Sequence, residues 1–170
     1  MEANLHPRVV VGVEQSLAGY AALRAAVSLA RSRRQPLYAV RGTTTLDAFP
    51  KQYVDQAFTE AVGGIPFDLD VYTTTMIDSA GSALTRTASD PRDLIVVGND
   101  GRGVLGAFWS GSVGRSLFKH ARCQILVVPA PEMHRATRRS ARKLHAGRTD
   151  VWDRFESEVP ELRGRPFQGT

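Results

Sequence analysis

The fold is decided by residues 93–112, which read DLIVVGNDGRGVLGAFWSGS. The stretch opens with Asp93 and the apolar run Leu94 to Val97, which is typical of a strand in a sheet covered on both faces. A glycine-rich loop begins at Gly98, and Ser112 begins a helix that we expect to end at His120. A strand, a glycine-rich loop and a helix in this order indicate an α/β domain with a parallel sheet.

Strands and helices also alternate along the rest of the chain. Strands are predicted at residues 9–13, 37–40, 67–72, 93–97 and 125–128. Helices are predicted from Ser16 to the residues before Pro36, near 51–62, at 79–89 and at 112–120. Polar positions within 67–72 favour an edge strand. Right-handed crossovers then predict a doubly wound five-stranded parallel sheet with helices on both faces.

Composition fits one globular domain with an appendage, since the chain has 170 residues, 42% hydrophobic and 23% charged. No stretch approaches the roughly 20 apolar residues that cross a bilayer, and the amino-terminal residues do not resemble a signal peptide, so we expect no membrane partner and a cytoplasmic location. The single cysteine, Cys123, has no partner for an internal disulfide or a CxxC site. We interpret it as a small buried side chain.

The positive charge of the chain is concentrated near its carboxyl terminus. Of the net charge of +5, +2 belongs to residues 1–130 and +3 to residues 131–170. We therefore predict a globular domain over 1–130 and a basic, amphipathic extension over 131–170. The basic segment 135–148 allows a hypothesis of binding to nucleic acid or an anionic surface. The absence of interleaved aromatic residues there argues against nucleic acid.

Three nucleotide-binding patterns can be compared with the loop that follows Gly98. The GxxxxGK[ST] pattern of P-loops is absent. Gly101, Gly103 and Gly106 match GxGxxG, but a dinucleotide fingerprint belongs to a first βαβ unit, with an acidic residue about 20 positions later. The third pattern, G-x2-G-x9-G-[ST], matches the loop between the predicted strand at 93–97 and the predicted helix at 112–120. Its members are Gly98, Gly101, Gly111 and Ser112, and it brings flexible backbone amides and a hydroxyl to a helix N-terminus, where anions bind.

With this motif the chain resembles the universal stress protein family over residues 8–130. Two further segments carry the resemblance, namely the first strand through Ser16 and the closing segment CQILVVP, residues 123–129. The resemblance implies an adenine nucleotide alpha hydrolase-like fold and a bound ATP or related nucleotide, with or without Mg²⁺. It also implies a homodimer that forms through the edge of the fifth strand.

The resemblance further implies which residues hold the nucleotide. Family members that bind nucleotide have an aspartate near the ribose and adenine where this chain has Glu14, and an aliphatic residue beside the base where it has Val40. The extra methylene of Glu14 moves the carboxylate outward by about one C–C bond. The candidate nucleotide-binding residues are Gly12, Val13, Glu14, Ser16, Val40, Gly98, Gly101, Arg102, Gly103, Gly111, Ser112 and Val113.

Catalytic patterns are weak in this sequence. Asp100 could hold Mg²⁺ through water, but an aspartate in an Asn-Asp-Gly turn is accounted for by turn chemistry. No Ser/His/Asp or paired-carboxylate arrangement can be assembled, so ATP hydrolysis, at most slow, is all we expect. We predict a nucleotide-responsive regulatory or sensor protein in which ATP orders residues 99–111. The alternative is a nucleotide-independent dimeric interaction protein that uses the edge at 125–128.

Overall fold

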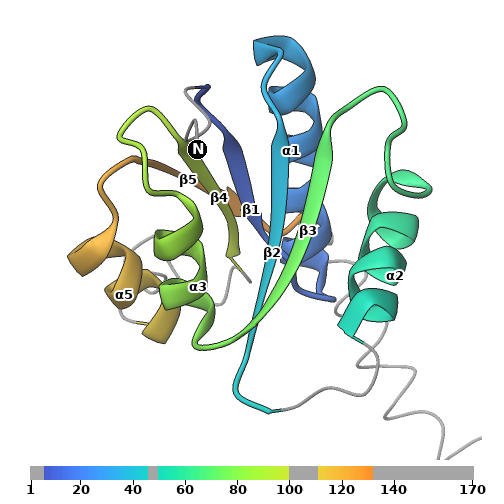
Figure 1. Ribbon diagram of the computed structural model, residues 1–170. Coiled ribbons are helices and arrows are strands. Elements are labelled where there is room, and N and C mark those ends of the chain that lie inside the picture. The colour runs from blue at the N-terminus through green and yellow to red at the C-terminus, as the bar shows by residue number, and fades with distance from the viewer. Residues whose placement is uncertain (1–5, 46–49, 100–110, 132–170) are drawn as a thin grey trace, which may run out of the picture. The chain divides into compact units, whose positions relative to one another are not determined.

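Five parallel strands form one sheet in the computed structural model, which describes residues 6–45, 50–99 and 111–131. The strand order is β3-β2-β1-β4-β5, so the chain winds outward from β1 in both directions (Figure 1). The strands are β1 (Val9–Gly12), β2 (Leu37–Thr43), β3 (Val71–Ile77), β4 (Leu94–Asn99) and β5 (Gln124–Pro129). The helices are α1 (Leu17–Arg33), α2 (Pro50–Val62), α3 (Ala80–Thr87) and α5 (Ser112–His120). The predicted fold class is confirmed.

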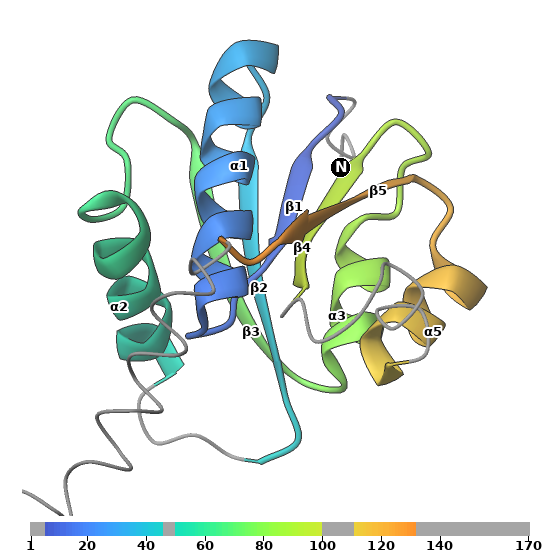
Figure 2. The same ribbon diagram turned by 180° about the vertical axis from the view of Figure 1, so that it is seen from behind.

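Helices cover both faces of the sheet, with α1 and α2 on one face and α3 and α5 on the other (Figures 1 and 2). The side chains of β1 alternate between these layers. Val9 and Val11 pack with α1 and α2, whereas Val10 packs with α3 and α5. All three valines are fully buried, which explains why the strand has a continuous apolar sequence. None of the helices in the described part of the chain is long and apolar enough to cross a membrane.

The third strand begins later than the sequence predicts. The structure has it at Val71–Ile77 rather than 67–72, and pairs it with β2 over its whole length. Phe67 and Asp68 therefore precede the strand. The side chain of Phe67 is fully exposed there, and Asp68 accepts two hydrogen bonds of 2.7 and 2.8 Å from Arg31. The β-branched run Thr73 to Thr75 occupies the strand instead. The prediction that this strand lies at an edge is confirmed.

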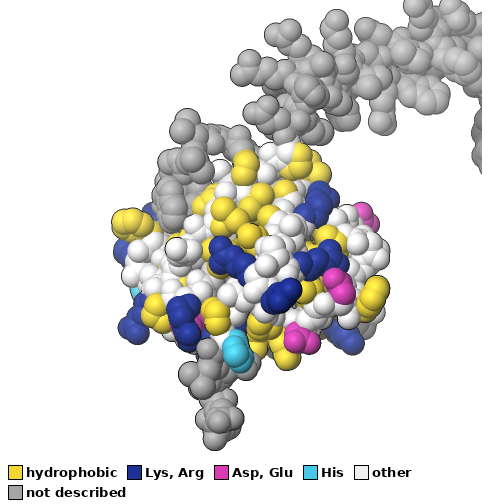
Figure 3. Space-filling view, turned by 90° about the horizontal axis from the view of Figure 1, so that it is seen from above, with side chains coloured by type: hydrophobic (Ala, Val, Ile, Leu, Met, Phe, Trp, Pro, Cys, Tyr) yellow, Lys and Arg dark blue, Asp and Glu magenta, His cyan; other side chains and the backbone are white. Residues whose placement is uncertain are grey.

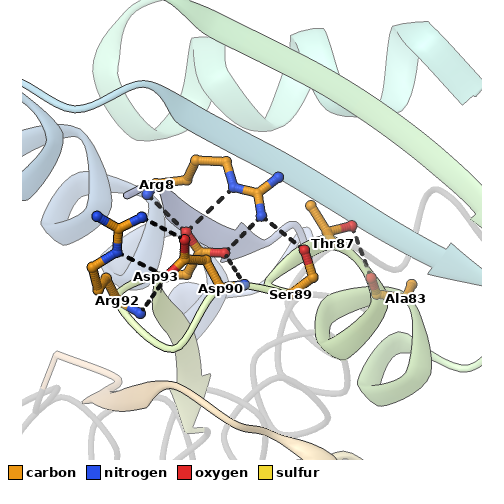
Figure 4. A network of polar contacts seen from close by, with 7 residues as sticks. All are labelled: Arg8, Ala83, Thr87, Ser89, Asp90, Arg92 and Asp93. Carbon is orange, nitrogen blue, oxygen red and sulfur yellow. Dashed lines mark hydrogen bonds and ion pairs between the residues drawn. The ribbon is translucent and has the colours of Figure 1, made fainter. Parts of the chain in front are cut away.

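A network of charged side chains joins the amino ends of β1 and β4 (Figure 4). Asp93, with 1% of its surface exposed, accepts hydrogen bonds from the backbone and the guanidinium of Arg8 and from the backbone of Asp90. Arg8 also donates to Ser89, and Arg92 pairs with Asp90 at 2.8 Å. Viewed from this end of the sheet, basic side chains lie among acidic, apolar and uncharged ones (Figure 3).

Candidate functional site

A cavity of about 350 Å³ opens at the carboxyl ends of β1, β2 and β4. From β1 the chain continues to β2 and β3 on one side, and the connection after β3 returns to β4 on the other side of β1, so the cavity lies at the point where the winding direction reverses. Ligands of open parallel sheets bind at this point, and the volume is in the range of small-molecule sites. The cavity is lined by Gly12, Val13, Glu14, Gly19, Val40, Arg41, Gly42, Tyr53, Ala80, Leu84, Val97, Gly98 and Val113.

The structure brings half of the predicted site residues to this cavity. Those that line it are Gly12, Val13, Glu14, Val40, Gly98 and Val113. Ser16 is the N-cap of α1 instead, where its hydroxyl accepts the N–H of Gly19 at 3.0 Å. Gly111 and Ser112 are exposed and begin α5 directly before Val113. The remaining three predicted residues, Gly101, Arg102 and Gly103, lie outside the described residues, as does the extension from residue 132.

Close backbone approaches shape the floor of the cavity. A Cβ at Gly98 would lie 2.5 Å from the backbone of Ala18, and one at Gly19 would lie 2.1 Å from the carbonyl oxygen of Glu14. At Gly42 a Cβ would lie 2.6 Å from the backbone of Ala80. Only glycine allows these approaches, which bring the first turns of α1 and α3 against the ends of the strands. Gly98 therefore has a packing role in addition to its place in the motif.

Three helices begin at the cavity, but their first N–H groups differ in how they are capped. Helix α1 is capped by Ser16, and α3 by Ser79, which accepts the N–H of Ser82. Asp78 adds a carboxylate beside α3, and the hydrogen bond from the Ser82 hydroxyl lowers the pKa of that carboxyl. Helix α5 has Gly111 at its N-cap and no side-chain hydrogen bond there. Within the part of the chain that the structure describes, its first amides are therefore the ones best suited to an external anion.

Among the described residues, the lining contains two charged side chains, Glu14 and Arg41. Helices α1, α3 and α5 have no acidic residue in their first turns, so the helix dipoles favour an anion on the cavity side. Among residues 6–45, 50–99 and 111–131, no cluster of three His, Cys, Asp or Glu forms a metal-binding group. The arrangement can hold an anionic ligand by its backbone amides and has one carboxylate for a polar group of that ligand.

Seven of the lining residues were not predicted from the sequence, and Arg41 and Tyr53 are the two of them with long polar side chains. The guanidinium carbon of Arg41 lies 3.5 Å from the centre of the Tyr53 ring. The Tyr53 hydroxyl accepts the N–H of Gln15 at 3.0 Å, and Gln15 Nε2 donates to the carbonyl oxygen of Tyr53 at 3.1 Å. Helix α2 is therefore fixed to the loop that carries Glu14. The sequence gives no local signal for this contact, because Tyr53 and Arg41 meet only through the tertiary fold.

Comparison with known proteins points to one family. A sequence model of the universal stress protein family matches residues 68–129. The chain is 36% identical over 69 residues to universal stress protein Slr1101 of Synechocystis, an alignment that covers 40% of this chain and 64% of that protein. The matched part thus spans less than two thirds of this relative. Together these similarities support the universal stress protein family.

Solved structures of universal stress proteins share the fold. The crystal structure of a universal stress protein in complex with cAMP superposes with a TM-score of 0.59 and 23% identity, over 74% of this chain and 98% of that one. A universal stress protein from Archaeoglobus fulgidus gives a TM-score of 0.55 and 20% identity, over 73% of this chain and 99% of that one. The structure of the universal stress protein from A. fulgidus in complex with dAMP gives a TM-score of 0.50 and 16% identity, over 73% of this chain and 98% of that one.

Proposed function

We propose that this chain is a universal stress protein that binds an adenine nucleotide, ATP above all, and acts as a nucleotide-responsive regulatory or sensor protein. The observation that carries the proposal is the cavity at the reversal point of the sheet, beside a helix whose first amides have no side-chain cap from the described residues. A phosphate placed at α5 would leave the rest of the ligand between β1 and β2, where Glu14 and Val40 lie.

The chemistry of the lining favours a nucleotide over a simple anion. Val13, Val40, Leu84 and Val97 give the cavity an apolar portion, which inorganic phosphate would not use. Glu14 can accept a hydrogen bond from a ribose hydroxyl or a base amine. Solved universal stress proteins of the same fold hold cAMP and dAMP, which supports a nucleoside phosphate as the ligand. We extend this to ATP, with or without Mg²⁺, because of the G-x2-G-x9-G-[ST] motif.

Binding is tested by calorimetric titration of nucleotide-stripped protein with ATP, MgATP, AMP, dAMP and cAMP. We expect dissociation constants in the micromolar range for the tightest of them, about −8 kcal/mol of binding free energy. Inorganic phosphate alone should bind far more weakly, because it leaves the apolar portion of the cavity unfilled. The absence of heat with every one of these nucleotides would refute the proposal.

A variant at Ser112 separates the site from the stability of the fold. Ser112 is exposed and begins α5, so Ser112→Glu adds a carboxylate where the helix dipole favours it. The same carboxylate would repel a phosphate at these amides. We expect Ser112→Glu to lower ATP affinity by about tenfold or more at unchanged or raised unfolding temperature. Ser112→Gln, of the same shape without the charge, is the matched control and should bind nearly as the unchanged protein does.

A second candidate function uses the edge of the sheet and needs no nucleotide. Strand β5 is an edge strand, and its residues Gln124–Pro129 include no charged side chain. Leu126 is 38% exposed there, and unprotected edges invite pairing with another chain. A homodimer through β5 should be visible by light scattering and should dissociate in Leu126→Lys. A dimer that persists while no nucleotide binds would favour this function, whereas a monomer would exclude it.

A further inference from the structure

The side of the cavity opposite α5 is built by Arg41 of β2 and Tyr53 of α2. With the guanidinium carbon only 3.5 Å from the ring centre, the two planar groups must lie nearly parallel, because a guanidinium on edge would push a nitrogen into the ring. Tyr53 is fixed in turn, since its hydroxyl and its carbonyl both bind Gln15. Arg41 is therefore held flat on a fixed support, at the edge of the cavity that it lines.

The position of this pair in the sheet separates it from the helix terminus suited to phosphate. Strand β1 lies between β2 and β4, and α5 packs on the face where Val10, Ile95 and Leu117 meet. Tyr53 belongs to α2, which packs with α1 on the other face. A ligand with its phosphate at α5 therefore reaches Arg41 with its far end. In a nucleotide that end is the base.

We infer that Arg41, supported by Tyr53, selects the ring system of the ligand by stacking on the base, and so favours purine over pyrimidine nucleotides. The inference rests on the proposed function and adds a residue that the motif does not contain. A guanidinium stacks on an aromatic plane with its own face, which an ammonium cannot do. Base stacking grows with the area of the base, so the larger purine gains more than a pyrimidine from the same surface. Because Arg41 is ordered on Tyr53 before ligand arrives, little side-chain entropy is lost on binding.

Neighbouring residues are consistent with a base at this position. Val40, next to Arg41 on β2, turns to the opposite face and is almost fully buried against α3 and α5. Gly42 has no side chain because α3 approaches it at Ala80, which leaves Arg41 as the long side chain at the end of β2 in the cavity. The flat guanidinium of Arg41, at the edge of a cavity that also has apolar lining, suits a planar, aromatic ligand group.

The test compares AMP with CMP, which share ribose and phosphate and differ in the base. We expect the unchanged protein to prefer AMP by about tenfold or more. Arg41→Met, which keeps the length but not the plane, and Arg41→Lys, which keeps the charge but not the plane, should both lower this preference toward one. Arg33→Met at the exposed end of α1 is the matched control and should keep it. Thermal unfolding of each variant shows whether it folds.

A second measurement uses the unchanged protein and needs no variant to fold. The NMR resonance of the Arg41 Nε–H should shift on addition of AMP through the ring current of the base, and hardly on addition of inorganic phosphate. Equal shifts with the two would mean that Arg41 responds to charge, and would overturn the inference. An unchanged AMP-to-CMP ratio in Arg41→Met and Arg41→Lys would overturn it as well, while ATP binding itself persists. Absence of any nucleotide binding to the unchanged protein would instead refute the proposed function, on which this inference rests.

Discussion

The two ends of the same parallel sheet differ in what their polar groups bind. At the amino end, the carboxylate of Asp93 is buried and accepts bonds from Arg8 and Asp90, so the charges there satisfy one another (Figure 4). At the carboxyl end, glycines let helices approach the strands, a cavity remains, and none of the described side chains caps the first amides of α5. A group that is already paired stabilises the fold, whereas a group left without a partner can bind a ligand.

This difference predicts that substitutions at the two ends will separate stability from binding. Changes in the Arg8–Asp93 network should alter unfolding without altering nucleotide affinity in the folded protein. Changes at exposed cavity residues should do the opposite. Gly98 belongs to both categories, because it packs against α1 and lines the cavity.

The largest effect on stability is expected at the amino end, from Asp93→Ala. The substitution leaves the Arg8 side chain, of which only 15% is exposed, without its buried carboxylate partner. Removing one partner of a buried pair typically costs about 3 kcal/mol or more, so urea unfolding should shift to clearly lower concentration. Asp68→Ala in the exposed pair with Arg31 is the control, and should change stability little. Similar midpoints for the two variants would contradict this account of the amino end.

Gly98→Ala should affect both stability and binding. Its Cβ would lie 2.5 Å from the Ala18 backbone, so α1 must move away from β4, at a cost of about 2 kcal/mol. The shift also displaces Gly19 and the floor of the cavity, which should weaken nucleotide binding. Gly12→Ala is the matched control for stability alone, because its Cβ would meet Leu84 at an ordinary 3.4 Å but Gly12 also lines the cavity. Denaturant unfolding and calorimetry of both variants provide the comparison, and equal stability of the two would show that the approach at Gly98 is not constraining.

A smaller, purely functional effect is expected from Glu14→Ala. Glu14 is exposed and lines the cavity, so its removal should lower the unfolding temperature far less than Asp93→Ala does. Loss of one hydrogen bond from a charged acceptor to the nucleoside should weaken binding by about tenfold. Glu60→Ala, exposed on α2, controls for the change in net charge. Unchanged AMP affinity in Glu14→Ala would show that the carboxylate does not contact the ligand.

The fold was largely predictable because its signals are local. The apolar runs of β1 and β4 indicate strands that are covered on both faces of the sheet, and Ser16 before α1 is a recognisable N-cap. The prediction of a strand at 67–72 was wrong, because it relied on the alternation from Phe67 to Asp70. The β-branched run Thr73 to Thr75 forms the strand, but its polar side chains make it hard to recognise from the sequence. That run is stabilised by pairing with β2, which no local pattern shows.

The candidate site was predictable where a motif or a strand end marks it. Glu14, Val40 and Gly98 follow or end strands, and the structure places each of them in the lining. Arg41 and Tyr53 could not be predicted, because their contact depends on how α2 packs beside β2. The close approach of Ala80 to Gly42 is likewise a tertiary fact, although a glycine at a strand end hints at it.

The smallest effect is expected from the exposed part of the amino-end network, on acidification. The guanidinium of Arg92, with its backbone N–H, lowers the pKa of Asp90 from 3.8 to about 2. A carboxyl with a depressed pKa stabilises the folded protein above its unfolded pKa, and that contribution is lost as pH falls through 2. The unfolding temperature of Asp90→Asn should therefore lie slightly below that of the unchanged protein at pH 6, and the two should converge by pH 2. Asp70→Asn, an exposed carboxylate before β3, controls for net charge. A gap that stays constant from pH 6 to 2 would mean that Asp90 acts through its shape or its backbone turn rather than through its charge.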